Sequence, residues 1–415
     1  MGYVDVARGR RALAAHDIDG LMVVSPENFE YFAGVSGFPV TMWRRAGLAT
    51  ALFAADGGLA FVVPETIADA VAHANPGARV YAYPLWIESV DVTGGASGAA
   101  DMPIEQRIAQ ATTGRQPARP EVYDLDTVDG LLREALHGLG LTGKRIGLEL
   151  DFAPAADVAR LAAMAAGREF VNSSQLIREM RLVKSPVEID LLRRGVALTE
   201  HGIVAALQGL DETTLAADIR GRYTEACSAE ARSRRELGFR GASTGVHLGP
   251  ALWAHTDPTR PARRGDLVQF DSTVQLNGYR TDMGRTFTFG PATDDQRRIQ
   301  AALLAGFAAG MAEMRPGRRF CDIFAAVHGA VRGTGFPSYA RGHVGHSIGS
   351  DIDGEEWPWI SAEQELVLEP GMVLAFEVPY YINGIGGFQN EDDILITQDG
   401  HESFNRLPLE LVRID

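Results

Sequence analysis

The stretch Gly265–Gly290 constrains the fold of this chain more than any other. It reads as two strands, rich in β-branched and aromatic residues, that are joined by a tight turn at Asn277-Gly278. Each predicted strand carries one aspartate, Asp271 or Asp282, and neither contains a lysine. Folding the ribbon at the turn brings the two carboxylates close together. Because paired carboxylates are costly to bury without positive charge, the ribbon predicts a site for a divalent cation.

The ribbon alone leaves a second interpretation open. Both aspartates could be turn residues or exposed strand positions. Arg280 and Arg285 are also near enough in the sequence to form salt bridges with them. The metal interpretation therefore depends on further ligands elsewhere in the chain.

Length and composition predict two globular domains. The chain has 415 residues, more than one hydrophobic core usually supports, and 46% of them are hydrophobic. A net charge of −15 argues against nucleic acid and an anionic membrane as partners, and we find no segment that could span a bilayer. The N-terminus lacks the apolar core of a secretory signal, so we expect a cytoplasmic protein. Two distant cysteines, Cys227 and Cys321, agree with a reducing compartment and argue against a disulfide framework or a zinc–thiolate site.

Residues 1–172 alternate strands and helices, as in an α/β domain. A helix at 7–18 is expected to precede an apolar strand at Leu21–Val24, and Leu125–Leu139 contains another helix. The segment 92–120 is rich in Gly, Ala, Thr and Pro, which predicts a surface loop or an insertion.

Residues 173–415 have a different pattern, which predicts helices grouped around a curved sheet. Ser185-Pro186 is a helix start, and Glu188 completes a capping box with Ser185. Further expected elements are helices at Leu215–Ala229 and Asp294–Met314 and strands at Val373–Pro379 and Glu391–Thr397.

Several residues outside the ribbon could complete a metal site. His343 and His346 lie in a Gly-rich segment, where the backbone can approach a ligand closely. Glu377 and Glu391 each belong to an apolar strand, and His255 precedes the first aspartate strand. Taken singly, each has an ordinary alternative, since a lone histidine is more often structural and a lone glutamate is more often exposed.

The set as a whole fits one chemical purpose. Two Asp, two Glu and one His form an oxygen-rich site that suits Mn²⁺, Co²⁺, Fe²⁺ or Zn²⁺. Four carboxylates could neutralise two divalent ions. Two such ions, on the order of 3.5–4 Å apart, lower the pKa of a bridging water and supply hydroxide near neutral pH.

The chain resembles the metallopeptidase family that includes aminopeptidase P, prolidase and methionine aminopeptidase, together with creatinase. The resemblance rests on the linker motif Lys184–Ile189 and on the segments GYRTDMGRTF, GHSIG, LEPGMV and NEDDILIT. It implies an α/β creatinase-like N-terminal domain over residues 1–172 and an α+β pita-bread catalytic domain over residues 173–415. A homodimer is also implied.

The same resemblance implies a full ligand set for two divalent metal ions, with Mn²⁺ favoured. The implied ligands are Asp271, Asp282, His346, Glu377 and Glu391. Asp282 and Glu391 would bridge the ions, Asp271 would complete one site, and His346 and Glu377 would complete the other. Glu377 would also relay the proton of the bridging water.

Two further histidines receive catalytic roles from the resemblance. His255 matches a histidine that contacts substrate and stabilises the tetrahedral intermediate. His343 stands three residues before His346, whereas the family histidine usually stands four before it. His343 is therefore a catalytic candidate whose side chain could point elsewhere.

This chain departs from the family pattern outside the ligand set. Asp353 and Gly354 stand where family peptidases usually have His-Glu, and Gln389 stands where they usually have arginine. The expected substrate contacts are His255, Asp353, Trp357, Tyr380 and Gln389. Trp357 and Trp359 could instead be packing residues. Trp43, Arg44 and Arg45 could reach the active site of a partner subunit.

We therefore expect a metal-dependent hydrolase that cleaves an amide-type C–N bond in a short peptide or a small molecule. An Xaa-Pro peptidase or dipeptidase is favoured by the resemblance, with a metal-activated bridging hydroxide as nucleophile. The departures at Asp353 and Gln389 favour a small-molecule amidohydrolase similar to creatinase or ectoine hydrolase. A metal-dependent lyase and a non-catalytic binding protein remain further alternatives.

Overall fold

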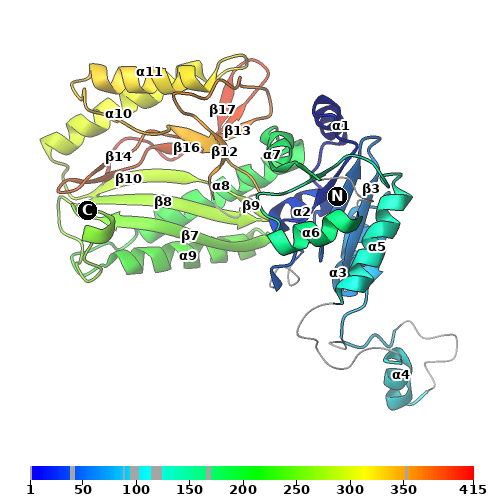
Figure 1. The fold of residues 1–415 in the computed structure, drawn as a ribbon. Helices are drawn as coiled ribbons and strands as arrows, with labels where there is room; N and C mark the ends of the chain where they lie inside the picture. The colour runs from blue at the N-terminus through cyan, green and yellow to red at the C-terminus, as the bar shows by residue number, and fades with distance from the viewer. Residues whose placement is uncertain are drawn as a thin grey trace. The chain divides into compact units, whose positions relative to one another are not determined.

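The computed structural model describes residues 2–37, 43–86, 89–93, 102–113, 124–164, 170–350 and 354–415. These residues form two compact units, Met1–Met180 and Arg181–Asp415 (Figure 1). The first unit ends beyond residue 172 because helix α7 (Ser174–Leu182) begins within it. The Arg8 guanidinium donates to the Glu179 carbonyl oxygen at 3.0 Å, and Leu176 and Ile177 of this helix are buried.

A six-stranded sheet forms the centre of the N-terminal unit, with the order β4-β3-β2-β1-β5-β6. The strands are β1 (Gly20–Val23), β2 (Thr50–Ala54), β3 (Leu59–Pro64), β4 (Arg79–Tyr83), β5 (Ile146–Leu148) and β6 (Val171–Asn172). Strand β2 runs antiparallel to β1 and β3, whereas the pairs β1–β5, β5–β6 and β3–β4 are parallel. This mixed sheet, with its helices, is the α/β arrangement that the sequence predicts.

The N-terminal unit also contains helices, and those predicted at 7–18 and Leu125–Leu139 are confirmed with slightly different bounds. The helices are α1 (Val6–Ala15), α2 (Pro26–Ala33), α3 (Glu65–Ala74), α4 (Ile104–Ala111), α5 (Leu125–Gly138) and α6 (Ala155–Met164). Helix α4 lies within residues 92–120 and corrects the loop alternative predicted there, while the alternative of an insertion stays a prediction; residues 94–101 and 114–120 lie outside the described residues. None of the α4 side chains is buried, so it has too few core contacts to produce a strong apolar pattern.

The C-terminal unit contains a ten-stranded sheet whose main path is β12-β11-β13-β16-β10-β8-β7. These strands are β7 (Phe239–Leu248), β8 (Leu267–Leu276), β10 (Met283–Phe289), β11 (Gly345–Ser347), β12 (Glu356–Trp359), β13 (Val373–Glu377) and β16 (Glu391–Ile396). The remaining strands of the sheet are β9 (Tyr279–Arg280), β17 (His401–Ser403) and β18 (Val412–Ile414), which pair with β8, β16 and β10. A separate two-stranded sheet consists of β14 (Tyr380–Ile382) and β15 (Gly386–Phe388).

Two helix pairs cover the strands of this unit (Figure 1). The helices are α8 (Pro186–Ala206), α9 (Ala216–Ser233), α10 (Asp294–Glu313) and α11 (Phe320–Gly333). The predicted capping box of α8 is confirmed, because the Ser185 amide donates to Glu188 Oε2 at 2.6 Å and the Ser185 hydroxyl accepts from the Glu188 amide. Helices α8 and α9 pack on β7 and β8.

Side-chain alternation separates the core face of the sheet from the opposite face. In β13, Leu374 and Phe376 belong to the hydrophobic core that includes α10 and α11, and so does Ile394 in β16. Because neighbouring residues of a strand point to opposite faces, Glu377 and Glu391 point away from that core. The sheet therefore holds these two glutamates on its other face.

The ribbon predicted from the sequence is confirmed as an antiparallel hairpin. Asn277 and Gly278 both have positive φ, at 48° and 86°, as a tight two-residue hairpin turn requires. The predicted second strand is interrupted, however, and continues as β9 and β10 on either side of Thr281 and Asp282. The Thr281 amide donates to the Val274 carbonyl oxygen at 3.1 Å, but the Val274 amide donates to the Thr281 hydroxyl and the Asp282 amide donates to the Asp393 carboxylate, so the regular ladder is interrupted here.

Candidate metal centre

The acidic residues of the site lie in one row across four strands. The strand pairing places Asp271 opposite Gly284, Gly284 opposite Glu391, and Glu391 opposite Glu377. Directly paired residues of antiparallel strands share a face, so these three carboxylates point to the same side of the sheet. Asp282 precedes Gly284 by two residues and therefore points to that side as well.

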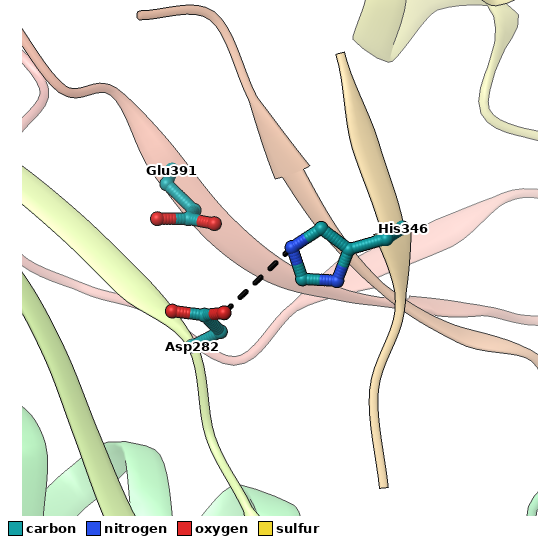
Figure 2. A group of neighbouring side chains, drawn as sticks. All are labelled: Asp282, His346 and Glu391. Atoms are coloured by element: carbon teal, nitrogen blue, oxygen red, sulfur yellow. Dashed lines mark ion pairs between the residues drawn. The ribbon is translucent and has the colours of Figure 1, made fainter. Parts of the chain in front are cut away.

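His346 joins this face from strand β11. It pairs with Ala375, which lies two residues before Glu377 on the same side of β13. Its Nδ1 lies 3.0 Å from the Ser347 carbonyl oxygen, which can accept only a proton held on Nδ1. In that tautomer Nε2 has a free lone pair, and Nε2 lies 3.7 Å from Asp282 Oδ2 (Figure 2).

Three of these side chains already form a compact donor set. Figure 2 shows Asp282, His346 and Glu391 converging from three separate segments, and their ligand atoms all lie within 4.8 Å of one another. His346 and Glu391 are buried and Asp282 is partly buried. Two carboxylates and a neutral imidazole nitrogen suit a divalent ion of borderline hardness, so the residues fit the metal that the sequence implies.

Glu377 lies beside several polar side chains. His343 Nδ1 is 3.2 Å and Arg341 Nη2 is 3.5 Å from Glu377 Oε1, although the His343 contact lacks the angle of a hydrogen bond. Gln389 Nε2 donates to Glu377 Oε2 at 3.2 Å and to Glu391 Oε2 at 3.0 Å. The structure thus brings His343 and Gln389 to the acidic face.

The electrostatics of this face favour cation binding. Burial, followed by repulsion from neighbouring carboxylates, raises the pKa of Asp282 and Glu391 well above the ordinary range. Burial also raises the pKa of Glu377 to about 7, against the opposing influence of Arg341. Asp271 reaches solvent, yet the protein atoms around its carboxylate raise its pKa as well. Burial lowers the pKa of His346, which keeps the imidazole neutral and able to bind a cation.

Arg285, one of the two arginines considered as salt-bridge partners, does not pair with the aspartates of the hairpin. Arg285 is buried and forms its ion pair with Asp392 at 2.5 Å, rather than with the aspartates of the hairpin. Its guanidinium also donates to the Leu407 and Glu391 carbonyl oxygens. Arg285 therefore ties the strands together, while Asp271 and Asp282 remain on the acidic face.

Two residues of this region, Asp393 and Arg341, were missed by the sequence reasoning. Asp393 is fully buried two positions after Glu391, and its carboxylate accepts the Asp282 amide proton at 3.4 Å. Its place in the alternation of NEDDILIT could have revealed it. The Tyr381 hydroxyl donates to Gln389, and the Arg341 guanidinium lies over the Tyr381 ring at 5.4 Å. No sequence pattern distinguishes Arg341 from an ordinary surface residue, whereas the sequence leaves Tyr381, together with Tyr380, open as either a pocket residue or a packing residue.

The other residues named from the sequence lie in various places. His255 ends the short 3-10 helix η3 (Trp253–His255) with an exposed side chain, and the exposed Trp253 ring contacts the Tyr381 ring at 4.9 Å. Trp357 and Tyr380 pack against the hydrophobic core of the C-terminal unit. Asp353 lies outside the described residues.

The N-terminal residues considered for a partner's site have contacts within their own unit. Arg45 forms an ion pair with Asp157 at 2.7 Å, and the Trp43 ring lies 6.3 Å from the Trp86 ring. Arg44 lines a small cavity of about 20 Å³ with Arg45. Their role in a partner's site stays a prediction.

Comparison with protein families agrees with this architecture. Residues 190–398, half of the chain, match the model of metallopeptidase family M24, and residues 6–183 match the creatinase/prolidase N-terminal domain. The chain belongs to metallopeptidase family M24. As a member of that family it is a metal-dependent hydrolase, and the predicted fold of a creatinase-like domain followed by an M24 catalytic domain is confirmed.

Individual relatives are distant but match most of the chain. The Bacillus subtilis protein YkvY is 28% identical over 290 residues, covering 68% of this chain and 76% of its own. A Pyrococcus horikoshii protein named Xaa-Pro dipeptidase is 26% identical over 282 residues, covering 67% and 77%. The solved structure of an Xaa-Pro dipeptidase from Bacillus anthracis superposes with a TM-score of 0.76 at 20% identity and covers 98% of each chain. This M24 member therefore has the fold of those proteins and a divergent sequence.

Among the described residues, none of the helices is both long and apolar enough to cross a membrane. The two cysteines are free thiols, as the sequence analysis expects, with Cys227 buried and Cys321 partly exposed.

Proposed function

We propose that this M24 member hydrolyses Xaa-Pro dipeptides with the help of two divalent metal ions. The observation that carries the proposal is the acidic face, where the strand register gathers Asp271, Glu377 and Glu391 beside Asp282 and His346. Four carboxylates and one neutral imidazole balance the charge of two divalent ions. The names of two relatives, Xaa-Pro dipeptidase, support the substrate class.

The five residues would hold the ions, with Asp282 and Glu391 shared between them. When bound, a pair of divalent ions acidifies a water molecule and polarises the scissile carbonyl. Glu377 is suited to hold and release a proton at its carboxylate, since its pKa lies at about 7 in the metal-free protein. His343 lies 3.2 Å from that carboxylate and could exchange the proton with it.

Aromatic and cationic side chains beside Glu377 would orient the substrate. The exposed Trp253 ring contacts Tyr381, whose other neighbour is the Arg341 guanidinium. Two aromatic rings offer an apolar wall that suits a pyrrolidine ring, and a guanidinium suits a carboxylate. We propose that these groups, together with His255 of the adjoining 3-10 helix, face the substrate.

Two measurements test this function. The metal content of protein purified without chelator should be close to two divalent ions per chain. After Mn²⁺ addition the protein should release proline from Xaa-Pro dipeptides and leave matched dipeptides without proline largely intact. Two ions without turnover of any dipeptide would exclude the peptidase and favour a small-molecule amide. A chain that binds no divalent ion would exclude the metal mechanism as a whole.

Mn²⁺ as the ion and a homodimer as the assembly are further proposals that rest on the family resemblance. Activity with Mn²⁺, Co²⁺, Fe²⁺ and Zn²⁺ at equal free concentration would rank the ions. Light scattering coupled to size exclusion would give the mass of the assembly.

A further inference from the structure

Gln389 places an uncharged amide between carboxylates of the proposed metal site. Its side chain is buried on the acidic face, beside Glu377 and Glu391. The amide nitrogen donates to Glu377 Oε2 at 3.2 Å and to Glu391 Oε2 at 3.0 Å, and the amide oxygen accepts the Tyr381 hydroxyl. Every polar atom of this side chain therefore has a partner.

These partners also determine the orientation of the amide. A carboxylate only accepts hydrogen bonds, so the end of the amide that faces Glu377 and Glu391 must be the NH₂ group. The Tyr381 hydroxyl then meets the carbonyl end, where it acts as the donor. The order from Tyr381 through Gln389 to the two glutamates is therefore fixed by chemistry.

The sheet itself is shaped around this side chain. Gly284 lies between Asp271 and Glu391 in the cross-strand row, and a Cβ atom built on it would lie 1.8 Å from Gln389 Cγ. The backbone amide of Gln389 also donates to Thr286 Oγ1 at 2.8 Å. The missing side chain at Gly284 thus leaves the space in which Gln389 lies.

We propose that Gln389 is a positioning residue for the metal centre and that Tyr381 acts through it. This inference rests on the metal site of the proposed function and changes the role of Gln389 from substrate contact to alignment of two ligands. The amide holds Oε2 of Glu377 and Oε2 of Glu391 from neighbouring strands, and it thereby fixes the orientation of the two carboxylates relative to each other. Groups that orient ligands in this way typically contribute 10- to 100-fold to metal affinity.

A neutral donor suits this task better than a cationic one. A guanidinium or ammonium between the two glutamates would neutralise part of their charge and repel an incoming divalent ion. The amide aligns the carboxylates without changing their charge. The attraction for two divalent ions is therefore retained.

The test compares three variants of the full-length protein. Gln389→Met keeps the approximate shape but removes the amide, Gln389→Glu replaces the donor by a third carboxylate, and Tyr381→Phe removes only the hydroxyl. Tyr223→Phe is the control, because it also removes a tyrosine hydroxyl bonded to an oxygen, that of the Thr273 carbonyl at 3.1 Å. Each is titrated with Mn²⁺ by calorimetry, and the visible spectrum of the Co²⁺ form is recorded.

We expect Gln389→Met to bind Mn²⁺ about 10- to 100-fold more weakly than the parent and to alter the Co²⁺ spectrum. Tyr381→Phe should weaken Mn²⁺ binding less than Gln389→Met does. In the double variant, Tyr381→Phe should weaken binding no further than Gln389→Met alone, because the Tyr381 hydroxyl acts through the Gln389 amide. Tyr223→Phe should bind as the parent does. If Gln389→Met does not fold, Tyr381→Phe and Gln389→Glu still give the result.

Two results would overturn the inference. One is parent-like Mn²⁺ affinity and an unchanged Co²⁺ spectrum in the Gln389 and Tyr381 variants, with only KM for the dipeptide raised, which would make Gln389 a substrate contact. The other is a double variant in which the losses of Mn²⁺ affinity from Gln389→Met and Tyr381→Phe add up, which would show that Tyr381 does not act through Gln389. Metal affinity is measured without substrate, so failure of dipeptide turnover would exclude the proposed function and leave this result standing.

Discussion

At the scale of single residues, the acidic face gathers like charges before any ion is bound. Asp282 and Glu391 have strongly raised pKa values because burial and mutual repulsion oppose their ionisation. The metal-free protein is therefore less stable at neutral pH than it would be with fewer of these charges. Replacing a carboxylate of the site by a neutral residue should therefore stabilise the metal-free protein and weaken ion binding.

Asp282→Asn is expected to stabilise the metal-free protein and to weaken Mn²⁺ binding. At pH 7.5 the free energy of unfolding in the presence of chelator should rise, because the neutral amide removes a buried carboxyl group whose pKa is raised by burial and by repulsion from the neighbouring carboxylates. Urea denaturation measures it. The matched control is Asp392→Asn, which removes the carboxylate partner of buried Arg285 and should lower stability by about 1–3 kcal/mol. Equal destabilisation by both changes would contradict the prediction.

The raised pKa of Glu377 predicts the direction of the pH dependence. Its folded value of about 7 lies above the ordinary value of 4.5, so the folded state holds a proton more tightly than the unfolded state does. The resulting stabilisation is complete below pH 4.5 and is lost as pH rises through about 7. With chelator, the melting temperature should therefore fall between pH 5 and pH 8.

Saturating Mn²⁺ should weaken or reverse that trend, because ion binding displaces the proton and favours the ionised carboxylates. Thermal melts in matched buffers measure both series. A metal-free protein that gains stability over the same pH range would contradict the assignment of Glu377 to this acidic face.

The residues of the site differ in how well the sequence revealed them. Asp271 and Asp282 stood out because carboxylates are rare within apolar strands. Asp393 has the same context but was overlooked, and its contact with the Asp282 amide depends on the interrupted strand. Arg341 could not be predicted, because its place beside Glu377 depends on how segments far apart in the sequence pack rather than on a local pattern.

At the scale of secondary structure, the hairpin and the helix caps were predictable because their signals are local. A positive φ at Asn277 and Gly278 and the reciprocal bonds of Ser185 and Glu188 need only neighbouring residues. The break between β9 and β10 was not predictable. It arises where the Thr281 hydroxyl accepts the Val274 amide and where the distant Asp393 carboxylate accepts the Asp282 amide.

Gly284→Ala should test the packing of β10 against Gln389. The added methyl group would meet Gln389 Cγ, so the amide should move and Mn²⁺ affinity should fall by about 10-fold. Gly329→Ala is the control, because its Cβ would meet no atom within 4 Å on the exposed side of α11. That change should raise stability by about 0.5–1 kcal/mol and leave Mn²⁺ binding unchanged. Calorimetric titration distinguishes them, and equal affinities would contradict the prediction.

At the scale of the whole molecule, the chain has two cores, and all five proposed ligands belong to the C-terminal unit. The division into an α/β part and a helix-covered sheet could be predicted from the change of pattern near residue 172. The position of the boundary could not, because helix α7 begins in the first unit through contacts with residues far away in sequence.

Ion binding should therefore stabilise the two units unequally. In calorimetric scans with chelator we expect two transitions, one for each core. Mn²⁺ at 100 times its Kd should add about 2.7 kcal/mol to the stability of the unit that binds it and raise one transition only. Equal shifts of both transitions would show that the ions stabilise more than the C-terminal unit.

The position of β16 has a consequence for the timing of metal loading. Glu391 is the last of the five proposed ligands along the chain, yet its strand lies in the middle of the sheet between β13 and β10. A nascent chain that still lacks β16 has neither the shared glutamate nor the neighbours that align Asp282 and Glu377. With the proposed ligand set, ions would therefore be bound only after β16 has been synthesised and has paired with β13 and β10.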